Sequence, residues 1–376
     1  MPYKVMFVVT SLIIGGAERQ LVQLLSRISR KDFEPLVVCL KEPGVLAAEL
    51  IQRDIPVYSR LLRNKYDLRV IPRLLSIIRK EKIHILWARS LGDKLFWGRL
   101  AGKLAGVPVI LGSIHFMGSK GQKKSIIGPL NKSLTPFTDR IIAVSENQKQ
   151  YLIEEEGLPP GKIVVVFNGI DLEAFKPTRD PQEVKKQLDL PKDYALIGQT
   201  AKLRPEKGHR LLLQAAKGVV QQKQKVIFLL IGDGPERPAL EDACRTLKLG
   251  SAIRFLGDRN DLPDLINILD MGTLSSPMET FPNALLEYMA LAKPVIAPNI
   301  GGVPEIITDQ AHGLLFSPGE AGSLEKSILE LLADPEKAKQ MGEAGAKRVG
   351  NLFSLEMNVK KIEQLFFTLL SEKGLH

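Results

Sequence analysis

Short apolar runs alternate with helical patterns along the whole chain, and this alternation limits the possible folds more than any other feature of the sequence. A continuous run such as Ile-Val-Val-Val at 163–166 is typical of a strand that is buried on both faces of a parallel sheet. Strands that alternate with helices predict βαβ units, and therefore doubly wound sheets with helices on both faces. Such sheets bind their ligands beyond the carboxyl ends of the strands.

The same rhythm is present in both halves of the chain. In the first half, strands are expected at 4–9, 35–40, 83–87, 108–112, 140–144 and 163–167, and helices near 17–29, 67–81, 92–105 and 145–156. In the second half, strands are expected at 195–200, 226–231, 253–256, 271–275, 295–297 and 313–316, and helices near 207–222, 235–248, 282–291, 319–333, 335–349 and 355–371.

The length of 376 residues favours two domains over one. Asn168 and Gly169 form a turn signal after the last strand of the first half, and prolines are frequent in the connection that follows. We therefore expect a first domain at 1–172, a second domain at 173–354 and a C-terminal helical segment at 355–376.

Cysteine usage and the length of the apolar runs favour a cytoplasmic protein. Cys39 and Cys244 do not form the pattern of a disulfide framework, which fits a reducing compartment. No apolar run reaches the length of about 18 residues that a membrane-spanning helix needs. The run at 5–14 is not followed by the cleavage pattern of a secretory signal, so we interpret it as the first strand.

The positive charge of the chain is concentrated in its first half. Residues 1–170 contain 26 Lys and Arg against 14 Asp and Glu, a difference of +12, whereas residues 171–376 contain 26 against 28, a difference of −2. A basic half can attract nucleic acid, an anionic membrane or an anionic acceptor, or it can simply be a solvated surface. Few aromatic residues lie between the lysines, so few side chains could stack on the bases of a nucleic acid. We therefore expect no nucleic acid as a partner.

Two glutamates flank the start of a predicted helix in the second half. A buried strand at 271–274 is followed by a polar loop with Glu279, and Pro282 indicates the first turn of the helix that carries Glu287. Glu287 would lie at the edge of the apolar stripe, beside Asn283 one turn earlier. A half-buried carboxylate needs a donor, and a helix start favours an anion, so a ligand with hydroxyls and a phosphate would satisfy both.

Other predicted strand ends carry groups that suit phosphate. Lys202 and Lys207 follow the strand at 195–200, and two ammonium groups there would face a diphosphate. Gly15 and Gly16 follow the first strand and open a helix, where the backbone can approach a phosphate closely. A simple tight turn explains this glycine pair equally well.

His115 follows the predicted strand at 108–112, so it would lie at a strand's carboxyl end. An isolated histidine most often has a structural role, and its position alone does not decide between a structural and a functional role.

The sequence has no Asp-x-Asp pair, no zinc-ligand spacing, no Ser-His-Asp signature and no phosphate-binding GxxxxGK[ST] loop. We therefore expect no metal site, and lysines and helix starts would carry the anionic ligand.

These motifs resemble those of the retaining glycosyltransferases of family 4, which have the GT-B fold. The two glutamates around Pro282 carry the resemblance, together with Asn-Gly-Ile-Asp at 168–171 and Gly-Gly-Val-Pro-Glu at 301–305. It is strongest over 200–305 and weaker over 1–170. The resemblance implies an α/β protein of two doubly wound Rossmann-like domains that face each other across a cleft, with the nucleotide sugar bound mainly by the second domain.

By this resemblance, four side chains of the second domain hold the donor. Glu279 would meet the hydroxyls of the sugar, and Glu287 would hold the ribose of the nucleotide. Lys202 and Lys207 would hold the diphosphate, although the family normally has an arginine at the position of Lys202. The departure matters because an ammonium cannot make the bidentate contact of a guanidinium.

The resemblance also implies the remaining candidates. The catalytic candidates are Glu279, His115 and Lys207, and His115 would approach the donor sugar. The other donor-binding candidates lie in the loop after the first strand and at the start of the helix near 282–291; they are Gly15, Gly16, Phe281, Pro282 and Asn283.

The activity that the resemblance implies is hexosyl transfer with retention at the anomeric carbon. It needs no metal or cofactor, because the nucleotide sugar is a substrate, and no protein nucleophile, because the diphosphate would take the acceptor's proton.

With the basic first domain on the acceptor side, we expect a lipid-linked or polysaccharide acceptor and peripheral contact with the inner face of an anionic membrane. The final helix would cross back to the first domain. Two alternatives stay open. The first is a GT-B sugar-nucleotide epimerase, and the second, which has less support, is a non-catalytic nucleic-acid-binding protein.

Overall fold

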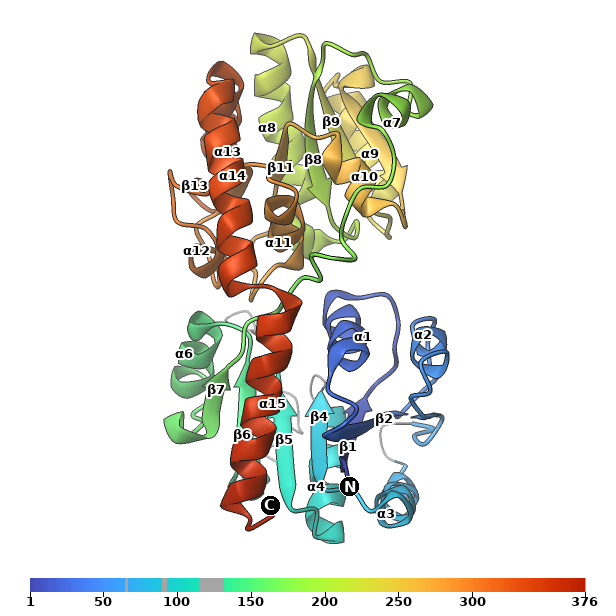
Figure 1. Ribbon diagram of the computed structural model, residues 1–376. Coiled ribbons are helices and arrows are strands. Elements are labelled where there is room, and N and C mark those ends of the chain that lie inside the picture. Colours follow the sequence, from blue (N-terminus) through green and yellow to red (C-terminus); the bar gives the residue numbers. More distant parts are fainter. Residues whose placement is uncertain (65–66, 90–92, 115–131, 376) are drawn as a thin grey trace. The chain divides into compact units, whose positions relative to one another are not determined.

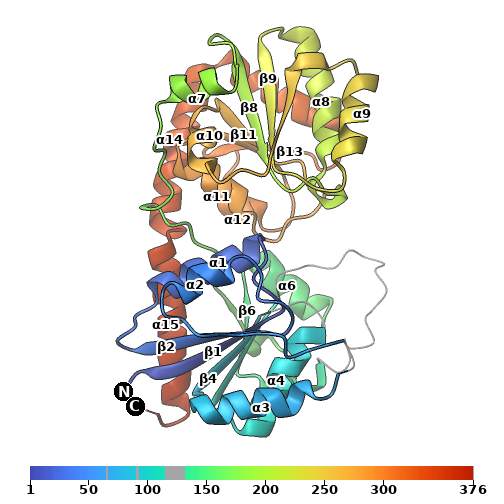
Figure 2. The ribbon, with the colours of Figure 1, turned by 90° about the vertical axis from the view of Figure 1, so that its right-hand side faces the viewer.

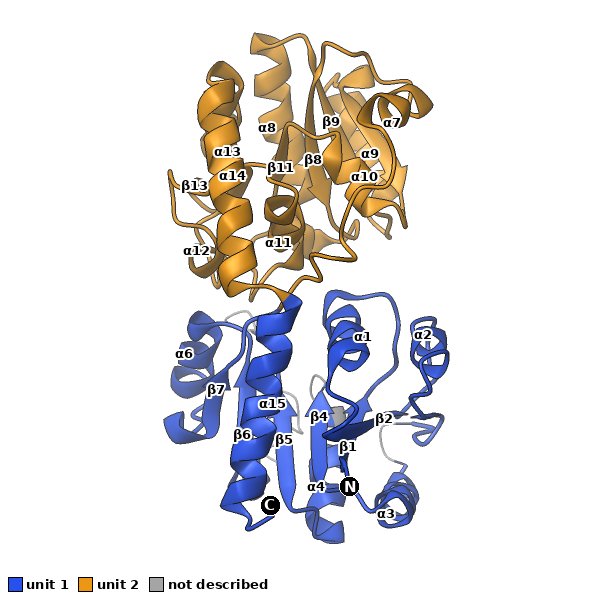
Figure 3. Ribbon diagram, viewed as in Figure 1, with its two compact units in different colours: residues 1–168, 355–376 blue, residues 169–354 orange. Residues whose placement is uncertain are grey.

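The computed structural model describes residues 1–64, 67–89, 93–114 and 132–375. Two compact units make up the chain (Figure 3). Unit 1 contains residues 1–168 and 355–376, and unit 2 contains residues 169–354. Helices and strands of both units are labelled in Figure 1.

Unit 1 is built on a seven-stranded sheet with the order β3-β2-β1-β4-β5-β6-β7, in which neighbouring strands pair in parallel. The strands in chain order are β1 (Tyr3–Val9), β2 (Phe33–Cys39), β3 (Val57–Tyr58), β4 (Ile85–Arg89), β5 (Val109–Ser113), β6 (Arg140–Ala143) and β7 (Ile163–Val165). The strand order reverses between β1 and β4, and in doubly wound sheets ligands bind at such a switch point, beyond the carboxyl ends.

Helices cover both faces of this sheet. Buried side chains of α1, α2 and α15 share one core cluster with the sheet, and those of α3 and α4 share another cluster on the opposite face (Figure 2). The helices are α1 (Gly16–Arg27), α2 (Ala47–Ile51), α3 (Val70–Glu81), α4 (Asp93–Ala105), α6 (Glu146–Glu154) and α15 (Leu355–Glu372), with 3₁₀ turns η1 (Thr135–Phe137) and η2 (Pro160–Lys162). The last helix, α15, is therefore part of the core of unit 1.

Unit 2 contains a six-stranded parallel sheet with the order β10-β9-β8-β11-β12-β13. Its strands are β8 (Ala195–Thr200), β9 (Val226–Ile231), β10 (Ile253–Gly257), β11 (Met271–Thr273), β12 (Val295–Pro298) and β13 (Gly313–Phe316). Its helices are α7 (Pro181–Gln187), α8 (His209–Gln222), α9 (Arg237–Thr246), α10 (Leu262–Asn267), α11 (Asn283–Ala290), α12 (Val303–Ile306), α13 (Ala321–Ala333) and α14 (Pro335–Leu352), with 3₁₀ turns η3 (Pro205–Lys207) and η4 (Gly250–Ala252).

Every strand expected from the sequence is present, and the differences lie at element ends. The strand expected at 271–275 ends at Thr273, and the helix expected from 207 begins only at His209. The helix expected from 282 begins at Asn283, because Pro282 has an extended ψ of 117° and is the N-cap rather than the first helical residue. None of the described helices has both the length and the apolar composition of a transmembrane segment.

Candidate active site

The turn after β8 brings the backbone of Lys207 against the end of β11. Gly208 has a positive φ of 65°, and a Cβ added there would lie 1.9 Å from the carbonyl oxygen of Ser275. Only glycine can hold this conformation at such a close approach. The requirement for glycine at 208 therefore follows from the contact between two strand ends.

A buried polar pair fixes this contact. Ser275 donates its hydroxyl to Oε1 of Gln199 at 2.8 Å, and Nε2 of Gln199 donates to the carbonyl oxygen of Lys207 at 3.2 Å. Gln199 is fully buried and Ser275 nearly so. Because a buried polar group is costly unless it is hydrogen-bonded, the pair holds the turn in one position.

The side chains of Lys207 and Glu279 meet at this position. Nζ of Lys207 lies 2.6 Å from Oε1 of Glu279, and the two side chains are 31% and 8% exposed. The loop of Glu279 is tied to the loop after β12, since the N–H of Gly302 donates to the carbonyl oxygen of Glu279 at 3.3 Å. Two of the candidates predicted from the sequence are thus brought together from positions 72 residues apart.

Lys202 lies against a different carboxylate. Its Nζ is 2.7 Å and 2.9 Å from the two oxygens of Asp258, which follows β10, and the pair is partly exposed. The N–H of Asp233, which follows β9, also donates to Asp258, at 3.0 Å. The N–H of Gly234, the guanidinium of Arg237 and the charge of Lys202 lower the pKa of Asp233. The ends of β8, β9 and β10 therefore share a charged network that the sequence did not predict.

Tyr288 locks α11 onto the sheet and so positions the helix that carries Asn283 and Glu287. Its hydroxyl accepts the N–H of Thr200 at 2.5 Å, and burial raises its pKa above the usual range. A Cβ added at Gly272 would lie 2.4 Å from the Tyr288 ring, so the helix rests directly on the strand. Asn283 begins α11 and Glu287 lies one turn later; both are half-buried.

The side chains of the two residues before α11, Phe281 and Pro282, pack in the interior. Phe281 is 5% exposed, and its ring packs edge-on against that of Phe353 with centroids 5.5 Å apart. Pro282 is also buried. The ring of Phe281 thus belongs to the interior of unit 2.

The other candidates belong to unit 1. Gly15 is the N-cap of α1 and Gly16 its first residue, at the carboxyl end of β1. A Cβ added at Gly15 would lie 2.4 Å from Oε2 of Glu18, so this carboxylate folds back over the start of its own helix. His115 lies outside the described residues.

His209 is a feature of the site that sequence reasoning missed. It is 3% exposed, and neither ring nitrogen has a hydrogen-bond partner in the part of the chain that is described. Burial, and in second place the charge of Lys207, lower its pKa to about 4. Its only sequence signal is its place two residues after Lys207.

This arrangement suits a ligand with hydroxyls and negative charge. A carboxylate such as that of Glu279 accepts hydrogen bonds from sugar hydroxyls, and an ammonium such as that of Lys207 donates to phosphate oxygens. Over the described ranges, no three His, Cys, Asp or Glu residues gather in a way that could hold a metal ion.

Two protein-family models match this chain, one in its first half and one in its second half. The family model described as "Glycosyltransferase Family 4" matches residues 14–174, and the model described as "Glycosyl transferases group 1" matches residues 180–348. Together the two models match most of the chain, including the turn of Lys207 and the loop of Glu279.

Two curated relatives align over most of their length. UDP-Gal:alpha-D-GlcNAc-diphosphoundecaprenol alpha-1,3-galactosyltransferase of Escherichia coli is 26% identical over 373 residues, which cover 96% of each chain. N-acetyl-alpha-D-glucosaminyl L-malate synthase of Bacillus anthracis is 27% identical over 325 residues, which cover 84% of this chain and 82% of the relative.

A solved structure matches the fold over nearly its whole length. Anabaena Alr3699/HepE in complex with UDP-glucose has a TM-score of 0.86 with this chain at 23% identity, and the match covers 97% of this chain and 99% of that one.

Proposed function

The chain belongs to the glycosyltransferases of family 4 and has their GT-B fold, and we propose that it transfers a sugar from a nucleotide sugar to a lipid-linked or glycan acceptor with retention at the anomeric carbon. The observation that carries this proposal is the ion pair between Lys207 and Glu279 at the strand ends of unit 2. It supplies a cation for the diphosphate and a carboxylate for the sugar within one partly buried contact.

In the proposed reaction, Lys207 donates to the diphosphate of the donor. Lys202 does the same once it exchanges Asp258 for a phosphate oxygen, a change that its partial exposure permits. The two ammonium groups stabilise the negative charge that develops as the nucleoside diphosphate leaves. Because these lysines supply the counter-charge, we propose that transfer needs no divalent metal or cofactor.

Glu279 orients the sugar through its hydroxyls, and Glu287 holds the ribose from its place on α11. We propose that the backbone of 281–283 closes around the sugar and that His115, which lies outside the described residues, has a catalytic role toward it. We also propose a role for the glycine pair Gly15-Gly16 in binding the donor phosphates. A uridine nucleotide is the best-supported donor class, since one relative is named for UDP-Gal and the matching solved structure contains UDP-glucose.

We infer retention without a covalent intermediate. In retaining glycosidases, a carboxylate acts as the nucleophile and a second group as the acid. Here the carboxylate of Glu279 is already engaged with Lys207 at 2.6 Å, which suits orientation of the sugar better than attack on it. The diphosphate takes the proton of the acceptor hydroxyl on the face from which it leaves.

The acceptor that we propose carries negative charge close to the reacting sugar or hydroxyl. One relative is named for a diphosphate-linked GlcNAc, and the other is named for L-malate, a dicarboxylate. A lipid-linked acceptor also fits the basic first half of the chain, and we propose that the protein works in the cytoplasm, at the inner face of the membrane.

A panel of nucleotide sugars, screened by thermal unfolding, tests the donor. A ligand that binds only the folded protein raises its unfolding temperature, so at least one UDP-sugar is expected to do so in a saturable way. Incubation of that donor with a diphosphate-linked GlcNAc lipid then gives a product whose anomeric configuration is determined by NMR.

Retention together with UDP release is the expected result. Inversion would contradict the mechanism proposed here. A changed sugar on an intact nucleotide, formed without an acceptor, would instead assign the chain to the epimerases.

A further inference from the structure

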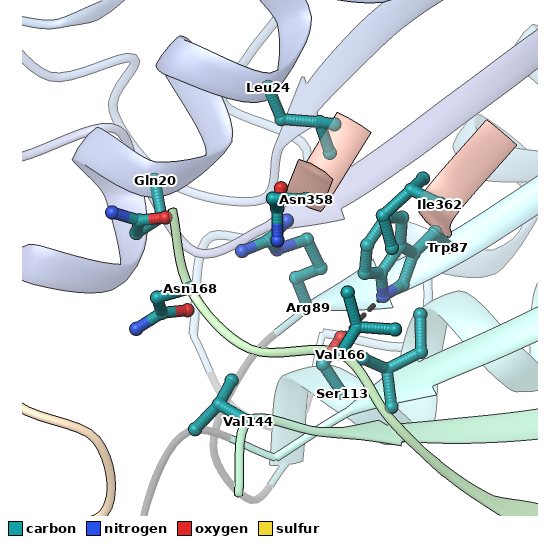
Figure 4. A pocket seen from close by; sticks show the side chains of 11 residues that line it. Gln20, Leu24, Trp87, Arg89, Ser113, Val144, Val166, Asn168, Asn358 and Ile362 are labelled. Carbon is teal, nitrogen blue, oxygen red and sulfur yellow. Dashed lines mark hydrogen bonds between the residues drawn. The ribbon is translucent and has the colours of Figure 1, made fainter. Parts of the chain in front are cut away.

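A small pocket with both polar and apolar side chains in its lining lies entirely within unit 1, where β4, β5 and β6 end (Figure 4). About 20 Å³ at its centre can be occupied by a water-sized group, and the surrounding hollow of about 320 Å³ is partly open to solvent. Polar side chains from five parts of the unit line it; they are Gln20, Arg89, Ser113, Asn168 and Asn358. None of them has a role in the donor site described above.

Arg89 is the charged member of this lining. It is the last residue of β4 and lies on the sheet face that Ile85 and Trp87 use for the core. It is only 8% exposed, and its guanidinium carbon lies 4.7 Å from the ring centroid of Trp87. The Trp87 ring is itself held by a hydrogen bond from its Nε1–H to the hydroxyl of Ser113, so the guanidinium rests on a fixed surface.

In the described part of the chain, the guanidinium of Arg89 makes no hydrogen bond and no ion pair, and its charge is in contact only with the ring of Trp87. Burial lowers its pKa to about 10, against a smaller opposing effect of the Glu18 carboxylate. The group is therefore still cationic at neutral pH. A buried charge without a partner is unfavourable for folding, and residues of this kind are concentrated at functional sites.

The surroundings of the guanidinium suit an oxyanion. In Figure 4 the end of Arg89 points toward the part of the pocket where Gln20 and Asn358 also lie. The amide of Asn358 is fixed, because its Nδ2 donates to the carbonyl oxygen of Phe167 at 2.6 Å. A volume of about 20 Å³ is large enough for one water-sized group, such as one oxygen of a phosphate or carboxylate.

Building on the transfer reaction proposed above, we propose that this pocket is the anion subsite of the acceptor, in which Arg89 binds a phosphate or carboxylate oxygen of the acceptor molecule. The donor diphosphate is assigned to Lys202 and Lys207 in unit 2. Arg89 lies in unit 1 and is not needed for this diphosphate. We therefore assign its positive charge to an anionic group of the acceptor, which is the second substrate of the reaction.

Thermal unfolding of the full chain tests the subsite with two probes, inorganic pyrophosphate and malonate, at constant ionic strength. Saturating UDP is present throughout, so that the diphosphate site of unit 2 is already filled. The variants are Arg89→Gln, Arg89→Lys and, as a matched control, Arg53→Gln, which removes an exposed arginine from the same unit. Both probes carry oxyanions, and their relative effect tells a phosphate-bearing acceptor from a carboxylate-bearing one.

We expect at least one probe to raise the unfolding temperature of the wild type and of Arg53→Gln in a saturable way. Arg89→Gln is expected to need at least tenfold more probe for the same shift, and Arg89→Lys to lie between them. The temperature shift caused by UDP alone is expected to be the same in all four proteins, which also shows that the variants are folded.

Three results would overturn the subsite. The wild type could show no response to either probe, or Arg89→Gln could respond as the wild type does. Arg89→Gln could also lose its response to UDP together with its response to the probe, in which case Arg89 supports the donor site or the fold. Absence of any UDP response in the wild type would instead count against the proposed transfer reaction.

Discussion

At the scale of single residues, the ion pair of Lys207 and Glu279 is the feature on which the site depends. Glu279 is 8% exposed, so its carboxylate depends on the ammonium at 2.6 Å for compensation. The sequence predicts both residues at strand ends. It does not predict their contact, because the contact is created by the buried pair Gln199 and Ser275 and by the absence of a Cβ at Gly208.

Replacement of Lys207 by Met is expected to reduce stability by about 2 kcal/mol, less than for a fully buried pair because Lys207 is 31% exposed. The double variant Lys207→Met/Glu279→Gln is expected to recover most of this loss, since it leaves no unpaired charge. Urea unfolding measures the free energy of each variant. Lys217→Met on the exposed side of α8 is the control, and equal stability of the single and double variants would show that the two side chains are not coupled.

Because His209 is buried, we expect the free energy of unfolding to depend on pH. Its pKa of about 4 in the folded protein lies below the ordinary value of about 6.5, so the unfolded chain binds more protons between these values. Stability therefore falls as the pH falls from about 6.5 to about 4, by an amount on the order of 2 kcal/mol from this residue. The variant His209→Leu is expected to lose this part of the dependence.

Unfolding by urea at pH 7 and pH 4.5 measures the effect. At pH 7 the leucine variant is expected to be at least as stable as the wild type, because both ring nitrogens of His209 are buried without partners in the described structure. The same pH dependence in both proteins would mean that His209 is protonated in the folded state without cost.

At the scale of elements, the long strands and helices follow from the sequence because their apolar patterns are continuous. The strands β8, β9 and β13 have the predicted ends. The short elements β3, α2, α10 and α12 were not predicted, since two to six residues are too few to show a period. Contacts between loops, such as that of Lys202 with Asp258, were not predicted either, because they join residues far apart in the chain.

The attachment of α11 to the sheet gives a prediction at this scale. Tyr288→Phe removes the hydroxyl that accepts the N–H of Thr200 and leaves that N–H unpaired. The expected loss of stability is about 1–3 kcal/mol, together with weaker donor binding, because α11 carries Asn283 and Glu287.

Calorimetric titration with UDP and urea unfolding measure the two effects of Tyr288→Phe. Tyr194→Phe is the control, as no hydrogen bond of its hydroxyl occurs within the described residues. If Tyr288→Phe loses stability but binds UDP as the wild type does, α11 does not position the donor.

At the scale of the whole molecule, the charge is divided between the two units. Residues 355–376 contain three Lys and three Glu, so unit 1 keeps the difference of +12 that residues 1–168 carry, while unit 2 has −2. This division was predicted from the sequence, since counting charges requires no structure. The contribution of α15 to the core of unit 1 follows from the resemblance rather than from the composition.

The basic unit predicts salt-dependent binding to anionic surfaces. The protein is expected to sediment with vesicles that contain anionic lipid at low salt and to be released as the salt concentration rises, because screening weakens the attraction. Neutral vesicles of the same size are the control. Equal binding to neutral and anionic vesicles would contradict a membrane role for this charge.

The rate of UDP release in the presence of donor and acceptor measures whether Lys207 and Glu279 form the active site. We predict that Glu279→Gln and Lys207→Met each lower this rate by about 100-fold or more, as loss of a group that stabilises developing charge or orients the sugar does, while Lys217→Met keeps it. If both site variants transfer sugar within about threefold of the wild-type rate, the ion pair is not the active site.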